Sequence, residues 1–540
     1  MSGKSNLDAG RNWPHWMIGF WISLCALLQV AGWGLSAVGQ LNAAGYVSVL
    51  GAAAVVAILF YRNRIAALRL SALHLQKLVR RFGRPLPLGF LVLAALAILG
   101  GLLYAPSNYD GLAYRVPRTL HWLAENRWHW ISTDFARMNT RGCGWEWVAA
   151  PVLAVLKTDR PLFVFNAISF LLLPGLTFSV LHRLGVRSRV AWHWMWLLPT
   201  GYCYLLQAGS IGNDLFGATF ALAAMYYALR ARQTGGASDV RLSVLAAALA
   251  TGTKSSNLLL GLPWLVAIAP ALKHLWTPRL LAPVLAAVAL LCSAIPISVL
   301  NWRHCGDWSG QALEGGAMSG APALRLLVNS LWIAQQNFAP PIFPFASHWN
   351  AAVKNTLPIE WRARLESLFE PGAAGFHLGE MASEEGAALG FGVSALLVVS
   401  WVATARRRAA LSLRPALPLR GWPFWVVPAA WMAVFLFMSQ SGLSAITRLL
   451  SPFYFLLAVP FLRSAGQESL VCTRLWRAGA WAVFALGAVL LVINPARPLW
   501  PAIPVLRAFG AEQSSHPLVQ RAWTVYSVYH ARPRAFEPVL

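Results

Sequence analysis

One acidic residue, Asp110, lies among arginines and aromatic residues in the stretch NYDGLAYRVPRTLHWL. It follows an apolar run near residues 86–104 by about one helical turn, so its carboxylate is expected where the membrane meets water. Arg115 and Arg118 follow it at helix-like spacing. A carboxylate can accept a proton from a hydroxyl, and an arginine can hold a phosphate through paired hydrogen bonds. This segment therefore combines a proton acceptor with phosphate-binding groups at a membrane boundary.

Further polar residues are predicted on the same side of the membrane. Each also has a structural interpretation: Asn213 and Asp214 can cap a helix, and Lys254 and Arg448 can extend to lipid headgroups. Tryptophans after Asp110 can simply anchor a helix at the interface. The candidate substrate-binding residues are Arg115, Arg118, Asp134, Arg137, Glu146, Asn213, Asp214, Lys254 and Arg448, and the aromatic surface comprises His121, Trp122, Trp128 and Trp130.

Composition decides which class of protein must position these groups. The chain has 540 residues, of which 57% are hydrophobic and only 12% are charged, against about 25% charged residues in an average soluble protein. Six cysteines are too few for a small disulfide scaffold, and the apolar content excludes disorder. We therefore expect an all-α, polytopic transmembrane helical bundle.

The net charge of +25 is distributed as a topology signal rather than as a nucleic-acid-binding surface. Residues 62–84 and 405–420 are rich in arginine and contain no acidic residue, as expected for cytoplasmic loops. No P-loop or GxGxxG motif occurs, so cytosolic nucleotides are not indicated as a substrate.

Twelve apolar runs, one of them split into two short helices at Gly252 and Lys254, predict about 13 membrane crossings with the N-terminus inside. Two long outer loops result, at residues 105–160 and 301–386, and they hold 13 of the 19 acidic residues. One interpretation is that long loops simply collect the polar residues of the chain. The other interpretation is a polar site on the outer face.

This path divides the chain into successive parts. They are an N-terminal two-span extension with a basic cytoplasmic loop (1–85), a membrane core (86–300) containing the first outer loop, the second outer loop (301–386), the C-terminal spans (387–494) and an outer tail (495–540). Cys143 and Cys305 fall in different outer loops, so a disulfide between them is permitted.

The ordered segments NYDGLAYRVPRTLHWL, ARMNTRGCGWEW, QAGSIGNDLFGATFALAAMYY, LATGTKSSNLLLGLPWL and TRLLSPFYFLLAVP cover roughly residues 86–463. This series resembles bacterial polytopic membrane glycosyltransferases of the GT-C superfamily. The resemblance implies a GT-C-like core and a catalytic aspartate in the first outer loop, the place that Asp110 occupies. It also implies a polyprenyl-phosphate-linked sugar as donor, a lipid, glycan or protein acceptor, and a site on the periplasmic face of the bacterial inner membrane.

On this resemblance Asp110 is expected to be the general base, and the arginines are expected to hold the lipid phosphate. Gly111 follows Asp110, so the DxD or paired-Asp motif is absent and a divalent metal remains an open question. Two alternatives are a transporter or flippase for a lipid-linked sugar and an enzyme of the O-antigen polymerase or ligase type. A transporter should have repeated halves and polar residues near the bilayer midplane, neither of which the sequence indicates.

Overall fold

The computed structural model describes residues 13–67, 79–276, 281–314, 321–368, 376–410, 421–443, 445–464 and 466–532. Every regular element within these ranges is a helix, and the extended pairing they contain is an isolated bridge between Ile342 and Met381. The prediction of an all-α protein is confirmed. Much of the basic stretches 62–84 and 405–420 lies outside the described side chains.

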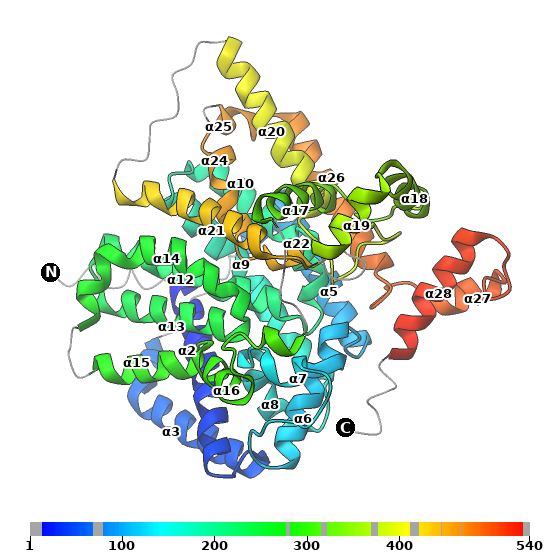
Figure 1. Cartoon of the computed structure of the whole chain (residues 1–540). Helices are drawn as coiled ribbons and strands as arrows, with labels where there is room; N and C mark the ends of the chain where they lie inside the picture. Colours follow the sequence, from blue (N-terminus) through cyan, green and yellow to red (C-terminus); the bar gives the residue numbers. More distant parts are fainter. Residues whose placement is uncertain are drawn as a thin grey trace.

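The long helices form the body of the molecule (Figure 1). They are α2 (Trp13–Ala37), α3 (Ala43–Ala67), α5 (Pro85–Leu103), α9 (Phe163–Arg183), α12 (Asn213–Thr234), α13 (Ala237–Thr253), α17 (Pro322–Asn337), α20 (Gly390–Ala410), α21 (Val426–Gln440) and α26 (Arg474–Ile493). The shorter helices are α6 (Val116–Ala124), α7 (Arg137–Thr140), α8 (Gly144–Leu156), α10 (Ser188–Leu197), α11 (Tyr202–Ala208), α14 (Gly261–Ile268), α15 (Leu281–Cys292), α16 (Ile295–Cys305), α18 (Ala346–Thr356), α19 (Ile359–Leu368), α22 (Ile446–Leu449), α23 (Tyr454–Leu457), α24 (Val459–Leu462), α25 (Gln467–Leu470), α27 (Ala502–Ala508) and α28 (Pro517–Ala531).

Five helices in the described part of the chain are long and apolar enough to cross a membrane, and α15 with α16 makes a sixth, bent by 55°. Two of the predicted spans are instead broken into short helices. The run at 190–207 divides into α10 and α11 around Pro199, and the run at 446–463 divides into α22, α23 and α24 around Pro452 and Pro460. Proline cannot donate the backbone hydrogen bond that a continuous helix requires. The chain is thus a helical membrane protein, while the number of about 13 crossings stays a prediction.

The centre of the bundle is α12, which is buried along almost its whole length and packs against α13 and α9. Small residues let the neighbouring helices approach closely, as is usual inside membranes. A Cβ atom on Gly252 would lie 2.1 Å from the carbonyl oxygen of Cys292, so only glycine fits where α13 meets the end of α15. Just beyond Gly252, α13 ends at Thr253 and Lys254 is extended, which confirms the predicted break.

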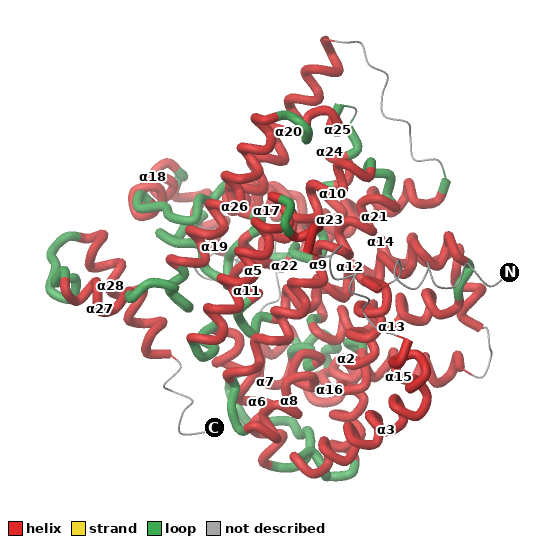
Figure 2. Tube along the Cα trace, turned by 180° about the vertical axis from the view of Figure 1, so that it is seen from behind, coloured by secondary structure: helices red, strands yellow, loops and turns green. Residues whose placement is uncertain are grey.

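The helices α18, α19, α27 and α28 gather on one side of the molecule, seen on the right in Figure 1 and on the left in Figure 2. Helix α8 behaves differently from the rest of the predicted first outer loop. It is apolar, buried over most of its length and packed against α2. Part of the segment 105–160 therefore belongs to the packed body, and the domain boundaries stay a prediction.

Candidate functional site

A π-helical turn, Gly111–Arg115, directly follows Asp110. Its i→i+5 hydrogen bonding, closed by the backbone N–H of Val116 to the carbonyl of Gly111, brings residues five apart onto one face. As a result, Arg115 Nη2 lies 3.3 Å from Asp110 Oδ2. In a regular α-helix of 3.6 residues per turn these two side chains would point in different directions. Pro117, at the second position of α6, needs no backbone donor there, so the chain continues as helix.

Asp110 is joined by an arginine from the other end of the chain. Arg448, in the short helix α22, places Nη2 3.0 Å from Asp110 Oδ2 and Nε 3.2 Å from Asp214 Oδ2. Arg115 also donates to Asn213 Oδ1 at 2.6 Å and to the carbonyl of Ile211 at 3.0 Å. The start of α12, the π turn and α22 therefore meet at one point.

The fifth ionisable member is Lys254, whose Nζ donates to Asp214 Oδ1. Asn213 next to it donates to the carbonyl of Thr253, which fixes the end of α13 against the start of α12. Glycine at 217 allows this approach, because a Cβ there would lie 2.7 Å from the amide nitrogen of Asn257. We call Asp110, Arg115, Asp214, Lys254 and Arg448 the charge cluster.

The charge cluster holds three cations and two carboxylates, so it carries a net positive charge of one. All five residues are buried or nearly so. Burial alone would raise the pKa of Asp110, but Arg448, Arg115 and Lys254 outweigh it and hold that pKa well below its usual range. The Asp110 carboxylate is therefore ionised and strongly attracted to its cations.

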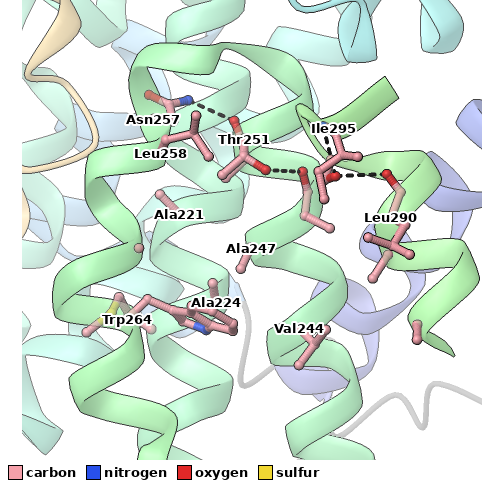
Figure 3. A pocket seen from close by; sticks show the side chains of 17 residues that line it. Ala221, Ala224, Val244, Ala247, Thr251, Asn257, Leu258, Trp264, Leu290 and Ile295 are labelled. Atoms are coloured by element: carbon pink, nitrogen blue, oxygen red, sulfur yellow. Dashed lines mark hydrogen bonds between the residues drawn. The ribbon is translucent and has the colours of Figure 1, made fainter. Parts of the chain in front are cut away.

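An apolar groove of about 440 Å³ begins one turn beyond Lys254. It runs between α12, α13, α14 and α15, with Asn257 and Thr251 at one end and Trp264 and Val244 toward the other (Figure 3). Alanines of α12 and α13 form much of its wall. The arrangement places an apolar groove beside a positively charged cluster.

Two other predicted residues, Arg118 and Glu146, form a separate pair. Both side chains are completely buried, and Arg118 Nε donates to Glu146 Oε1 at 3.1 Å. Arg118 also donates to the carbonyls of Arg141 and Gly142, at 2.9 and 2.7 Å. Every nitrogen of this guanidinium is therefore used within the protein, and the structure does not bring the pair into the charge cluster.

The remaining predicted residues of the first loop lie further out. Arg137 is 3.4 Å from Glu314 of the second loop and Arg141 pairs with the same carboxylate, so these contacts join the two loops. Asp134 is exposed. The predicted interfacial aromatic surface is only partly correct: Trp122 is 1% exposed and stacks on Trp147 at 5.0 Å, because α6 packs onto α8.

Sequence reasoning missed Arg497, which pairs with Glu384 of the second outer loop. Arg497 Nη2 lies 3.4 Å from Glu384 Oε2 and also donates to the carbonyl of Leu206. Burial raises the pKa of Glu384 to about 7, an effect that Arg497 opposes and the neighbouring Glu385 reinforces. A signal for Arg497 existed, since it directly follows the last apolar run in NPARPLW, where a buried arginine needs a carboxylate.

The sequence left open both a metal ion at the site and a disulfide between the two outer loops. Across the described ranges, no three His, Cys, Asp or Glu side chains come together in a way that could hold a metal ion. Cys143 and Cys305 are both free, so the disulfide that the topology permitted is not formed. Cys305 instead directs its thiol to the carbonyl of Asn301 at 3.0 Å, and Cys143 is buried.

The fold and its site are those of a helical membrane protein with a buried, positively charged cluster beside an apolar groove. Two crystal structures are similar to this chain over most of its length, both of ArnT from Cupriavidus metallidurans. The apo form is 14% identical with a TM-score of 0.41, over 82% of this chain and 75% of that chain. The form bound to undecaprenyl phosphate is 16% identical with a TM-score of 0.42, over 84% and 79%. No family model and no curated protein matches the chain.

Proposed function

We propose that this protein is an integral membrane glycosyltransferase that moves a sugar from a polyprenyl-phosphate donor to an acceptor on the periplasmic face of the bacterial inner membrane. The observation that carries the proposal is the charge cluster at the end of the apolar groove. A polyprenyl chain is long and apolar and ends in a phosphate. The groove would take the chain and the cations would take the phosphate.

The charge of the cluster favours a particular donor. A sugar linked through one phosphate is a diester with a single negative charge, which would neutralise the net charge of one on Asp110, Arg115, Asp214, Lys254 and Arg448. A pyrophosphate-linked sugar would bring an additional negative charge into a buried site. We therefore assign the donor to the polyprenyl-monophosphate class.

The proposed reaction is a single displacement at the anomeric carbon of the donor sugar. The acceptor oxygen attacks the anomeric carbon of the sugar, the bond from that carbon to the phosphate oxygen breaks, and its electron pair stays on the phosphate. Arg115, Lys254 and Arg448 stabilise the charge that develops on this leaving group. The proton of the acceptor hydroxyl passes to Asp110, so the products are the glycosylated acceptor and polyprenyl phosphate.

Asp110 can act as a base only when it is partly released from its cations. Arg448 and Arg115 keep its pKa low, which makes it a weak proton acceptor. A bound phosphate competes for the same guanidinium groups, and the pKa of Asp110 rises as those contacts are shared. Donor binding would thus activate the base.

The test uses membranes containing the wild-type protein or Asp110→Asn, incubated with a panel of radiolabelled undecaprenyl-phosphate sugars. We expect label to leave the donor fraction with the wild type and the rate to fall by about 10²–10⁴-fold with D110N. Protein level and binding of undecaprenyl phosphate should survive, because asparagine keeps the size of the side chain.

Glu125→Gln is the matched control, since Glu125 lies in the same segment but is exposed. Its rate should equal that of the wild type. Undiminished transfer by D110N would remove Asp110 as the base, and no transfer from any panel member together with no binding of undecaprenyl phosphate would refute the proposed function.

A further inference from the structure

A second cavity, of about 410 Å³, lies on the side of the molecule where α28 meets the loop before α20. Its walls come from α17, from residues 377–388 and from α28. This volume lies within the range of sites for small molecules, about 300–1,000 Å³. The groove beside the charge cluster is almost entirely apolar, whereas this cavity is lined by both aromatic and charged side chains.

The lining has the chemistry of a sugar-binding surface. Trp332, Phe343 and Tyr529 present aromatic groups, which suit the C–H faces of a sugar ring. Glu380 and Glu385 present carboxylate oxygens, which accept hydrogen bonds from hydroxyls. An aromatic surface with a few placed hydrogen-bonding groups is the usual composition of a specific small-molecule site.

Charge within the cavity argues against an anionic ligand. Arg521 Nε lies 3.2 Å from Glu380 Oε1, so the cation is paired with a carboxylate. Glu385 remains as a further negative charge in the wall. A phosphate entering here would meet no unpaired cation among the described lining residues, while a neutral polyhydroxylated ligand would meet oxygen acceptors.

Glu385 also connects the cavity to the charge cluster. Its Oε2 accepts from the hydroxyl of Tyr529 at 3.5 Å, and its Oε1 accepts from the backbone N–H of Tyr109 at 3.3 Å, one residue before Asp110. Thr447, one residue before Arg448, donates its hydroxyl to the carbonyl of Gly386 at 2.8 Å. The wall of the cavity therefore contacts the residues directly before Asp110 and Arg448.

We propose that this cavity binds the acceptor and that the acceptor is a neutral glycan, with the hydroxyl to be glycosylated directed toward Asp110. The assignment rests on the proposed function, because it is the transfer reaction that requires an acceptor beside the charge cluster. The C-terminal helix α28 then forms one wall of the acceptor site.

Two variants of α28 provide a matched test. Val525 lines the cavity, whereas Val528 on the same helix is 47% exposed and does not line it. Val525→Trp should fill the cavity, and Val528→Trp should add the same side chain to the surface. Each protein is purified in a detergent without a sugar headgroup. Binding of a panel of neutral disaccharides composed of glucose, galactose, mannose or N-acetylglucosamine units is followed by saturation-transfer NMR. Binding of undecaprenyl phosphate is followed by native mass spectrometry.

We expect the wild type and V528W to bind at least one neutral disaccharide and V525W to lose that binding, with all three proteins still binding undecaprenyl phosphate. Tyr529→Phe, which removes only the hydroxyl that donates to Glu385, should weaken the same disaccharide and serves as the second variant if V525W does not fold. The acceptor assignment would be overturned if no disaccharide bound the wild type, or if V525W or Y529F bound the disaccharide as well as the wild type does. It would also be overturned if the wild type preferred glucose 6-phosphate to the neutral sugars. Retained binding of undecaprenyl phosphate would in that case leave the donor proposal standing.

Discussion

Arg115 and Arg118 are three residues apart, and both side chains are completely buried, yet they serve different purposes. Arg118 is fully used by Glu146 and two carbonyls. Arg115 shares Asp110 with Arg448, in a cluster where cations outnumber carboxylates. In the first arrangement the charges cancel, whereas in the second a net positive charge is left that an anion can neutralise.

The comparison shows that burial of a charge does not by itself identify a ligand site. The opposite charges of a buried ion pair such as Arg118–Glu146 cancel, and removal of one partner leaves an uncompensated buried charge. A buried cluster with surplus charge is costly unless something neutralises it. The surplus, rather than the burial, distinguishes the candidate site here.

The largest effect that would test this comparison concerns the pair of Arg118 and Glu146. Arg118→Ala leaves Glu146 charged, buried and unpaired, so we expect a loss of stability of about 3–5 kcal/mol. The measurement is thermal unfolding of the purified protein in detergent. The double variant R118M/E146L should recover much of the loss, because it removes the unpaired charge. If R118A kept its stability and instead weakened binding of undecaprenyl phosphate, the pair would belong to the site and the distinction would fail.

A smaller effect is expected in the charge cluster. Arg448→Ala removes charge-assisted hydrogen bonds worth about 1.5–3 kcal/mol, so the KM for the lipid-linked donor should rise by roughly 10–100-fold. The fold should survive, since Asp110 keeps Arg115 and Asp214 keeps Lys254. The KM of Arg448→Lys should lie between those of the wild type and R448A, because lysine keeps the charge but lacks the paired hydrogen-bond donors of arginine. Arg477→Ala, an exposed residue of α26, is the control, and an unchanged KM in R448A would count against a phosphate-binding role.

The smallest effect concerns Glu384 and Arg497, a third buried pair with a looser contact of 3.4 Å. The folded-state pKa of Glu384, about 7, lies above its ordinary value of 4.5, so the folded state binds a proton that the unfolded state has lost. Wild-type stability should therefore fall as pH rises from about 4.5 to 7.

In Glu384→Gln this pH dependence is removed. The melting temperature of E384Q minus that of the wild type should increase across the same pH window, by roughly 2 °C. A difference that stays constant with pH would show that Arg497 keeps Glu384 ionised. Glu384 and Arg497 would then form an ion pair whose charges cancel, as those of Arg118 and Glu146 do.

Much of the charge cluster could be predicted from the sequence. Asp110 and Asp214 stand near the ends of apolar runs, Lys254 stands at the predicted break in another, and Arg448 lies just inside the start of a fourth. Tracing those runs assigned all four to one side of the membrane. Helix ends on one side of the membrane lie at a similar depth, so the topology predicts that these four side chains lie near one another. The all-helical fold follows in the same way from apolar content.

Other features depend on packing that the sequence does not display. The π turn places Arg115 over Asp110, and spacing in the sequence is normally interpreted with an α-helical period. Helix α8 is shorter than a membrane span, so its apolar sequence gave no sign that it enters the core. Arg118 and Arg115 look alike in the sequence, and only the position of Glu146 on α8 separates their roles.

The contact between Asp110 and Arg448 joins residues 338 positions apart. A ribosome that adds about 5–20 residues per second delivers Arg448 roughly 20–70 s after Asp110. During that interval the early helices enter the membrane with the aspartate lacking one of its two arginines. Arg115 and Lys254 alone match the two carboxylates until then, so the excess cation of the charge cluster is added only in the last quarter of synthesis. A prematurely ended chain would therefore carry a neutral cluster that has lost its attraction for an anion.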